Sequence, residues 1–121
     1  MRSMSKHRHW KLKIEDMLDR IDKIERFVAD KTYEDFAADD MAVDAVERNF
    51  EVIGEASNLV PTYIKRSHPD IPWRALYGMR NHIDHGYDLP DTRILWTTAQ
   101  NRLGDLRSSL ERVLRRGGRR R

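Results

Sequence analysis

Apolar residues recur at steps of three and four along three long stretches of the chain. They are Trp10, Ile14, Met17, Ile21, Ile24 and Val28 in the first stretch, Ala42, Val46, Phe50, Ile53, Ala56 and Val60 in the second, and Trp96, Ala99, Leu103, Leu106, Leu110 and Val113 in the third. These steps place one apolar face on an α-helix. No segment alternates convincingly with the period of a strand. We therefore predict an all-α fold, an up-down helical bundle of about four to five helices.

Aspartates and prolines mark where the helices should begin. Asp39 or Asp40 precedes the second long stretch and Asp91 precedes the last, and aspartate is a preferred N-cap residue. Pro61 and Pro72 can each stand at the first turn of a helix. The expected helices cover about 10–28, 41–60, 62–67, 73–84 and 91–113, with a short helical turn at 34–36.

Composition narrows the class of protein. The chain has 121 residues, enough for one domain with one core. It has no cysteine, which excludes disulfides and thiolate metal sites. No apolar run approaches the ~20 residues of a membrane span, and the basic N-terminus is not followed by the apolar stretch of a secretory signal. We expect a cytoplasmic protein with no membrane partner.

The charge of the chain is concentrated at its two ends. Residues 1–13 hold five basic residues and no acid, and residues 115–121 hold five arginines. The remaining 13 basic and 20 acidic residues give the central part, 14–114, a charge of −7. We expect a basic segment at 1–10, a helical domain at 11–114 and a disordered Arg-rich tail at 115–121. Such a tail can raise the affinity for nucleic acid or simply aid solubility.

The segment MRNHIDHGYD, residues 79–88, holds the most chemically capable group of side chains. Arg80, His85 and Tyr87 follow one another at fixed spacing. An arginine supplies a planar cation that pairs with phosphate, a histidine exchanges protons near neutral pH, and a tyrosine adds a hydroxyl. On an ideal helix His85 lies ~140° from Arg80, so the two converge only if the helix loosens near Gly86.

Two other interpretations of this segment remain open at this stage. Arg80 and Asp84 share a helix face and could form a surface ion pair, with His85 solvated at the helix end. His82, Asp84 and His85 could instead suggest a metal site, although three ligands within one turn rarely converge.

Other polar and aromatic residues carry weaker signals. Arg48 and Glu55 lie seven residues apart, roughly on one helix face, with Asn49 beside them. They form either an exposed charged face or polar support for a cleft. His7 and His9 are expected at the surface. The three tryptophans fall on apolar stripes or beside them and are expected in the core rather than in a ligand cage; they are Trp10, Trp73 and Trp96.

The sequence resembles the HepT-like ribonuclease toxins of the HEPN superfamily. The resemblance is carried, in order, by DAVERNFEVIGEAS at 44–57, HPDIPWRALYGMRN at 68–81 and HGY at 85–87, and it extends from about 11 to 114. It implies an all-α homodimer whose two motifs face a shared cleft, acting as a metal-independent endoribonuclease that needs no cofactor.

The resemblance also implies roles for individual residues. Arg80 and His85 would be catalytic, with Asn81 as the polar residue after the arginine. Tyr87 would be the tyrosine that a partner nucleotidyltransferase antitoxin modifies with AMP. The sequence departs from the family at Asp84 and His82, where relatives often carry aliphatic or small residues, and in its basic ends. Asp84 could tune His85 or repel phosphate, and we class it as a supporting residue.

The expected chemistry agrees with these roles. RNA cleavage without a metal needs a base for the ribose 2′ proton and a cation for the phosphorane, which His85 and Arg80 can supply. The product would end in a 2′,3′-cyclic phosphate, and DNA would be inert. The alternative is a non-catalytic helical module that binds a nucleotidyltransferase or RNA.

Overall fold

A computed structural model describes the backbone of residues 2–84 and 91–118 and the side chains of 9–79 and 91–118. The described residues form seven helices and no strand, as the all-α prediction requires. The helices are α1 (Arg2–Val28), α2 (Tyr33–Ala38), α3 (Asp40–Asn58), α4 (Thr62–Ser67), α5 (Trp73–Asp84), α6 (Thr92–Asn101) and α7 (Leu103–Arg116).

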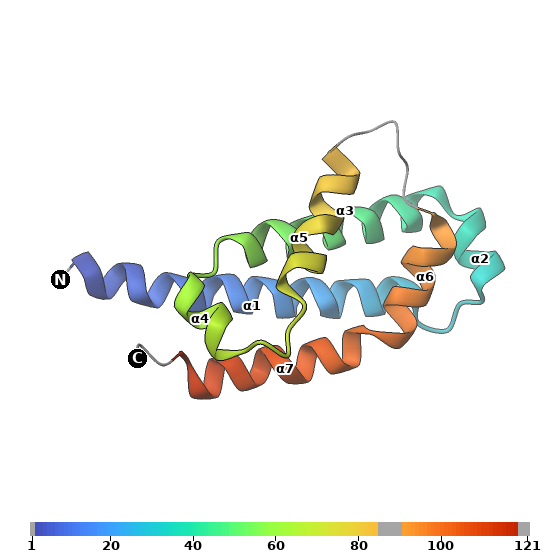
Figure 1. Ribbon diagram of the computed structural model, residues 1–121. Coiled ribbons are helices and arrows are strands. Elements are labelled where there is room, and N and C mark those ends of the chain that lie inside the picture. Colours follow the sequence, from blue (N-terminus) through green and yellow to red (C-terminus); the bar gives the residue numbers. More distant parts are fainter. Residues whose placement is uncertain (1, 85–90, 119–121) are drawn as a thin grey trace.

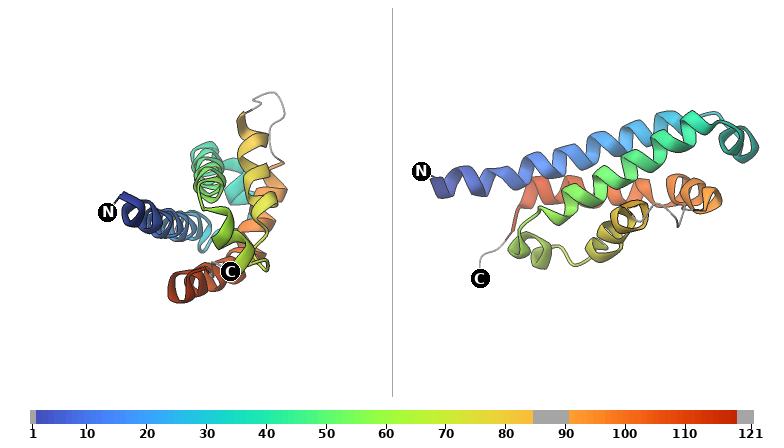
Figure 2. Two further views of the ribbon diagram at one scale, coloured as in Figure 1. Left: turned by 60° about the vertical axis from the view of Figure 1, so that its left-hand side comes forward. Right: turned by 90° about the horizontal axis from the view of Figure 1, so that it is seen from above.

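The long helices pack around one apolar core. α1 and α3 lie side by side. α7 runs along α1 and α5 crosses α3, and both lie on the same side of the α1–α3 pair (Figures 1 and 2). All six apolar positions predicted for the first helix and all six predicted for the second are buried. Trp10 is buried, and Trp73 and Trp96 pack partly buried against the core, which confirms that the tryptophans belong to it.

The predicted caps are confirmed by hydrogen bonds to side-chain oxygens. Asp39 accepts from the backbone N–H of Ala42 at 3.1 Å and begins α3. Asp91 accepts from the N–H of Arg93 at 2.8 Å and begins α6. These contacts satisfy N–H groups that a helix start would otherwise leave unpaired.

The last predicted helix is two helices, not one. The helix is interrupted at Arg102, and the chain changes direction between α6 and α7 (Figure 1). α6 packs against α1 and against α2, where the ring centres of Trp96 and Phe36 lie 5.4 Å apart, while α7 packs along α1. The steps of three and four continue through the break, so the pattern of apolar residues gave no sign of it.

Both ends of the chain are more helical than predicted. α1 begins at Arg2, within the expected basic segment. α7 continues through Arg115 and Arg116, past residue 114 where the helical domain was predicted to end, and Gly117 and Gly118 lie against Trp10 of α1 and Ile64 of α4. None of the described helices has the length and apolarity needed to cross a membrane.

Candidate active site

α5 is the element that carries the Arg80 motif, and its first turn is fixed by the connector before it. Ile71 is buried, and the indole N–H of Trp73 donates to the carbonyl of His68 at 3.0 Å. The carbonyl of Pro72 accepts from the N–H of Leu76 at 3.0 Å, and this is the first hydrogen bond of the helix. Proline suits this position because it has no backbone N–H that would need a partner. The start of α5 is therefore tied to the end of α4 through the hydrogen bond between Trp73 and His68.

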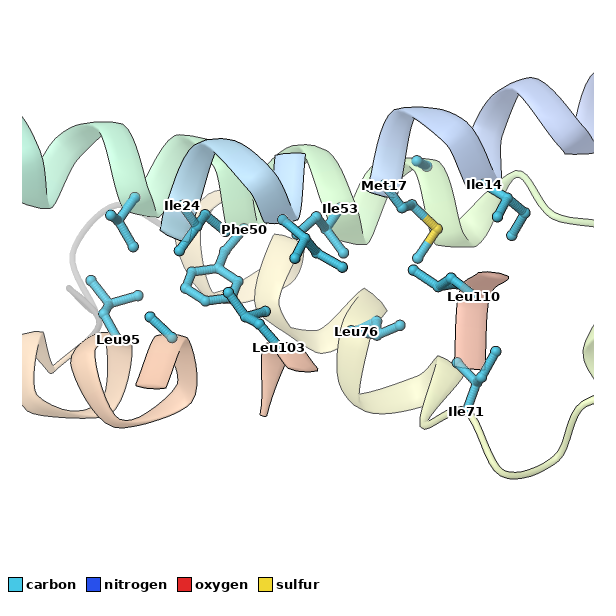
Figure 3. Close-up of a cluster of buried hydrophobic side chains, with 14 of the residues drawn as sticks. Ile14, Met17, Ile24, Phe50, Ile53, Ile71, Leu76, Leu95, Leu103 and Leu110 are labelled. Carbon is cyan, nitrogen blue, oxygen red and sulfur yellow. The ribbon is translucent and has the colours of Figure 1, made fainter. Parts of the chain in front are cut away.

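One face of α5 packs against α3. Leu76 is 6% exposed, and Met79 is partly buried against the core. Leu76 belongs to the same buried cluster as Phe50 and Ile53 of α3 (Figure 3). Gly54 of α3 is also buried. The position of α5 on α3 therefore depends on apolar packing.

The predicted site residues lie at the end of this helix. The backbone of Arg80, Asn81 and Asp84 is in the last part of α5, as predicted, and Arg80 follows Leu76 by one turn. The side chains of residues 80–84 lie outside the described residues, and so do His85 and Tyr87. The convergence of Arg80 with His85, the Arg80–Asp84 pair and the His82 metal alternative stay predictions.

One of the two interpretations offered for the polar residues of α3, an exposed charged face, holds for Arg48. Arg48 is exposed and donates to Glu51, so it belongs to a charged outer face. Asn49 is buried; its side chain donates to the carbonyl of Ala45 at 2.7 Å and accepts from the guanidinium of Arg20 on α1 at 3.1 Å. Asn49 therefore serves as a polar link between α1 and α3.

The contact between Arg20 and Asn49 was missed from the sequence. One signal for it existed, because position 49 lies three residues after Val46 and four before Ile53, within the apolar stripe. A polar residue in such a stripe needs a buried partner. The Arg20 side of the contact had no comparable signal.

Few of the titratable groups on the described helices have a shifted pKa. Burial, with a smaller effect of Asp44, raises the pKa of Glu47 on α3. Hydrogen bonds with Glu25 and Asp22 raise the pKa of Arg107, which links α7 to α1. Among the residues whose side chains are described, no three His, Asp or Glu side chains come together as a metal site.

Comparison with known proteins decides the family. The sequence profile described as "Ribonuclease HepT-like" matches residues 17–113, which is most of the chain. The chain belongs to the HepT-like ribonuclease family. This confirms the resemblance inferred from the three sequence segments.

Several relatives of this HepT-like chain are similar over most of their length. A protein of Thermococcus cleftensis named "Probable ribonuclease HepT" is 39% identical over 100 residues, covering 83% of this chain and 91% of the relative. A "Putative RNase" of Methanocaldococcus jannaschii is 34% identical, covering 83% of this chain and 86% of the relative. Another from Caldanaerobacter subterraneus is 31% identical over 85 residues, with coverages of 70% and 76%. No solved structure matches.

Proposed function

We propose that this HepT-like protein is a metal-independent endoribonuclease in which Arg80 and His85 carry out cleavage. The observation that carries the proposal is the family match over residues 17–113, which contains the whole Arg80–Tyr87 segment. Its support in the fold is the placement of α5, whose apolar face is buried on α3 up to Met79, directly before Arg80. A firmly packed helix is a suitable carrier for a catalytic group, because rate depends on sub-ångström placement.

The reaction follows from the chemistry of the two side chains. Neutral His85 accepts the proton of a ribose 2′-OH, and the 2′ oxygen attacks the adjacent phosphorus. Arg80 stabilises the negative charge of the phosphorane with its guanidinium. The bond to the 5′ oxygen breaks, and that oxygen takes up a proton. The products are a 2′,3′-cyclic phosphate and a 5′-hydroxyl, and a strand without 2′-OH groups is not cut.

The family resemblance supports a two-subunit site. In a homodimer, two copies of Arg80 and His85 would face one cleft, so the group that removes a proton and the group that returns one could belong to different subunits. Light scattering at micromolar concentration should then give twice the mass of one chain. A monomer with full cleavage activity would contradict the shared cleft.

The cleavage test compares substitutions at Arg80 and His85 with a control substitution in α5. Arg80→Ala and His85→Ala should each lower RNA cleavage by ~100-fold or more while helix content is unchanged. Arg80→Lys should not restore it fully, since an ammonium cannot form the bidentate fork. Arg74→Ala is the matched control, because Arg74 is an exposed arginine of α5 outside the motif. Inhibition by EDTA that a divalent ion reverses would contradict the mechanism.

The proposal includes a regulatory partner. We infer that the protein is a cytoplasmic toxin and that a nucleotidyltransferase antitoxin transfers AMP to Tyr87. The added phosphate would lie close in sequence to Arg80 and could occupy the place of an RNA phosphate. Co-expression with such a transferase, followed by peptide mass spectrometry, should find AMP on Tyr87 and loss of cleavage. The exposed Tyr77 of α5 provides the control Tyr77→Phe. Neutralisation of Tyr87→Phe by the same partner would show that it acts by occlusion.

A further inference from the structure

One end of the molecule gathers cations from three helices. The start of α1, the short helix α4 and the end of α7 lie together there, close to both chain ends (Figures 1 and 2). We call the described cations of this region the basic pole: Lys11, Lys13, Lys65, Arg66, Arg115 and Arg116.

Direct contacts hold these three helix ends together. The carbonyl of Gly117, just after α7, lies 2.7 Å from the Nε2 of the buried His68, just after α4. A Cβ placed on Gly117 would lie 3.7 Å from the ring of Trp10 on α1, and one on Gly118 would lie 2.6 Å from Ile64 on α4. The cations flank these contact residues in sequence, so packing brings them to one region of the surface.

The cations of the basic pole are largely uncompensated. Among the described residues, Lys11, Lys13, Arg66, Arg115 and Arg116 make no ion pair. The nearby carboxylate of Asp70 is already paired with Arg112 at 3.1 Å, while Glu15 and Glu111 are exposed acids of the same helices. The sequence adds three more cations before Lys11 and three arginines after Gly118. The central part of the chain, by contrast, carries −7.

We propose that the basic pole binds the phosphate backbone of the RNA substrate outside the cleavage site. This inference rests on the proposed function for the identity of the polyanion. Unpaired cations gain affinity for nucleic acid by releasing its counterions. The pole is also joined to α5, since the Nζ of Lys65 lies 6.0 Å from the ring centre of Trp73. Arg80 follows Trp73 by seven residues, which is ~10 Å along the helix.

A lipid surface is the weaker candidate for this polyanion. A helix that lies in a membrane surface needs a free apolar face. The apolar face of α1, from Trp10 to Val28, is buried in the core. Leu12 is exposed between Lys11 and Lys13, but it is a single side chain.

The experiment compares two triple variants that each remove three positive charges. The first replaces Arg66, Arg115 and Arg116 of the pole with Gln. The matched control replaces Arg26, Lys31 and Arg102, which lie toward the other end of the bundle and make no ion pair among the described residues. The probe is a short labelled oligoribonucleotide with 2′-O-methyl groups, which cannot be cut, measured by anisotropy between about 50 and 200 mM salt.

The pole variant should bind the probe ~10- to 100-fold more weakly at about 0.1 M salt. The slope of its plot of log affinity against log salt should become less negative by about two, because each lost phosphate contact removes ~0.7 from the slope. The control should change little. Equal losses in both variants, or none in the first, would overturn the proposal. So would pole-dependent binding to phosphatidylserine vesicles with unchanged binding of the probe. Cleavage of unmodified RNA by the unsubstituted protein tests the proposed function separately, since binding of the probe requires no chemistry.

Discussion

Shortening Leu76 should loosen the helix that carries Arg80 without unfolding the protein. Leu76 is the buried residue of α5 one turn before Arg80, and its side chain lies in the cluster that joins α5 to α3 (Figure 3). Leu76→Ala removes that anchor and leaves the exposed face of α5 unchanged. Because the change is apolar to apolar, any effect on RNA cleavage cannot come from altered charge.

The expected cost is worked from burial. Leu→Ala changes in cores cost ~2.7–5 kcal/mol, and Leu76, at 6% exposed, belongs near the lower bound, so we expect ~3 kcal/mol. A chain of 121 residues has a free energy of unfolding of roughly 6–18 kcal/mol at 0.05–0.15 kcal/mol per residue. At least ~3 kcal/mol remains, so more than ~99% of the variant is folded at 25 °C.

The assay is urea unfolding followed by single-turnover RNA cleavage on the same preparation. The matched control is Leu103→Ala, a core leucine of α7 that is 1% exposed. Both variants should be destabilised, but Leu76→Ala should lose ~10-fold or more of its cleavage rate, because misplacing a catalytic group by about 1 Å can cost ~100-fold. A fully active Leu76→Ala that is destabilised as expected would refute the claim that packing of α5 positions Arg80. Equal loss of rate in the control would refute it as well.

Two further predictions concern charged groups. Arg107→Ala should lower the free energy of unfolding by about 1 kcal/mol, because a half-exposed arginine loses its bonds to Asp22 and Glu25, and the difference from the unsubstituted protein should shrink at high salt. Glu47 has a raised pKa in the folded state, so folding holds its proton more tightly and stability should fall as pH rises above its ordinary value of 4.5. Glu47→Gln should remove that part of the pH dependence and raise stability at pH 7, as urea titrations across pH would show.

The helices could be predicted from the sequence because their signals are local. The stripes of α1 and α3 and the caps Asp39 and Asp91 depend on residues a few positions apart. The break at Arg102 could not be predicted, because it depends on which helices α6 and α7 pack against, and the apolar steps continue across it. The bond between Arg20 and Asn49 joins positions 29 residues apart, beyond the reach of periodicity.

The site was predicted from chemistry and family resemblance more than from pattern. Helical periodicity placed Arg80 near the end of α5 and did so correctly. It could not bring Arg80 and His85 together, since five positions on one helix point about 140° apart. Their predicted convergence depends on the path of the chain after residue 84, which is not encoded in a period of three and four. The resemblance supplied the roles that periodicity could not.

Two glycines in the last part of the chain, Gly104 and Gly118, differ in the space around them. A Cβ on Gly118 would lie 2.6 Å from Ile64 Cδ1, so that the side chain or the chain end would have to shift, and it would make a tight contact of 3.2 Å with the Cα of the same residue. A Cβ on Gly104, in the exposed first turn of α7, would meet nothing within 4 Å. Gly118→Ala should therefore push the chain end away from α4, while Gly104→Ala should stabilise α7 by up to ~1 kcal/mol through helix propensity.

Limited trypsin digestion followed by intact-mass measurement tests this difference. Gly118→Ala should lose its C-terminal arginines faster than the unsubstituted protein, because cleavage after Arg115 and Arg116 requires the end of α7 to detach from α4. Gly104→Ala should be cut there no faster and should unfold at higher urea concentration. If the two variants release the tail at the same rate as the unsubstituted protein, the packing of Gly118 on Ile64 does not hold the chain end.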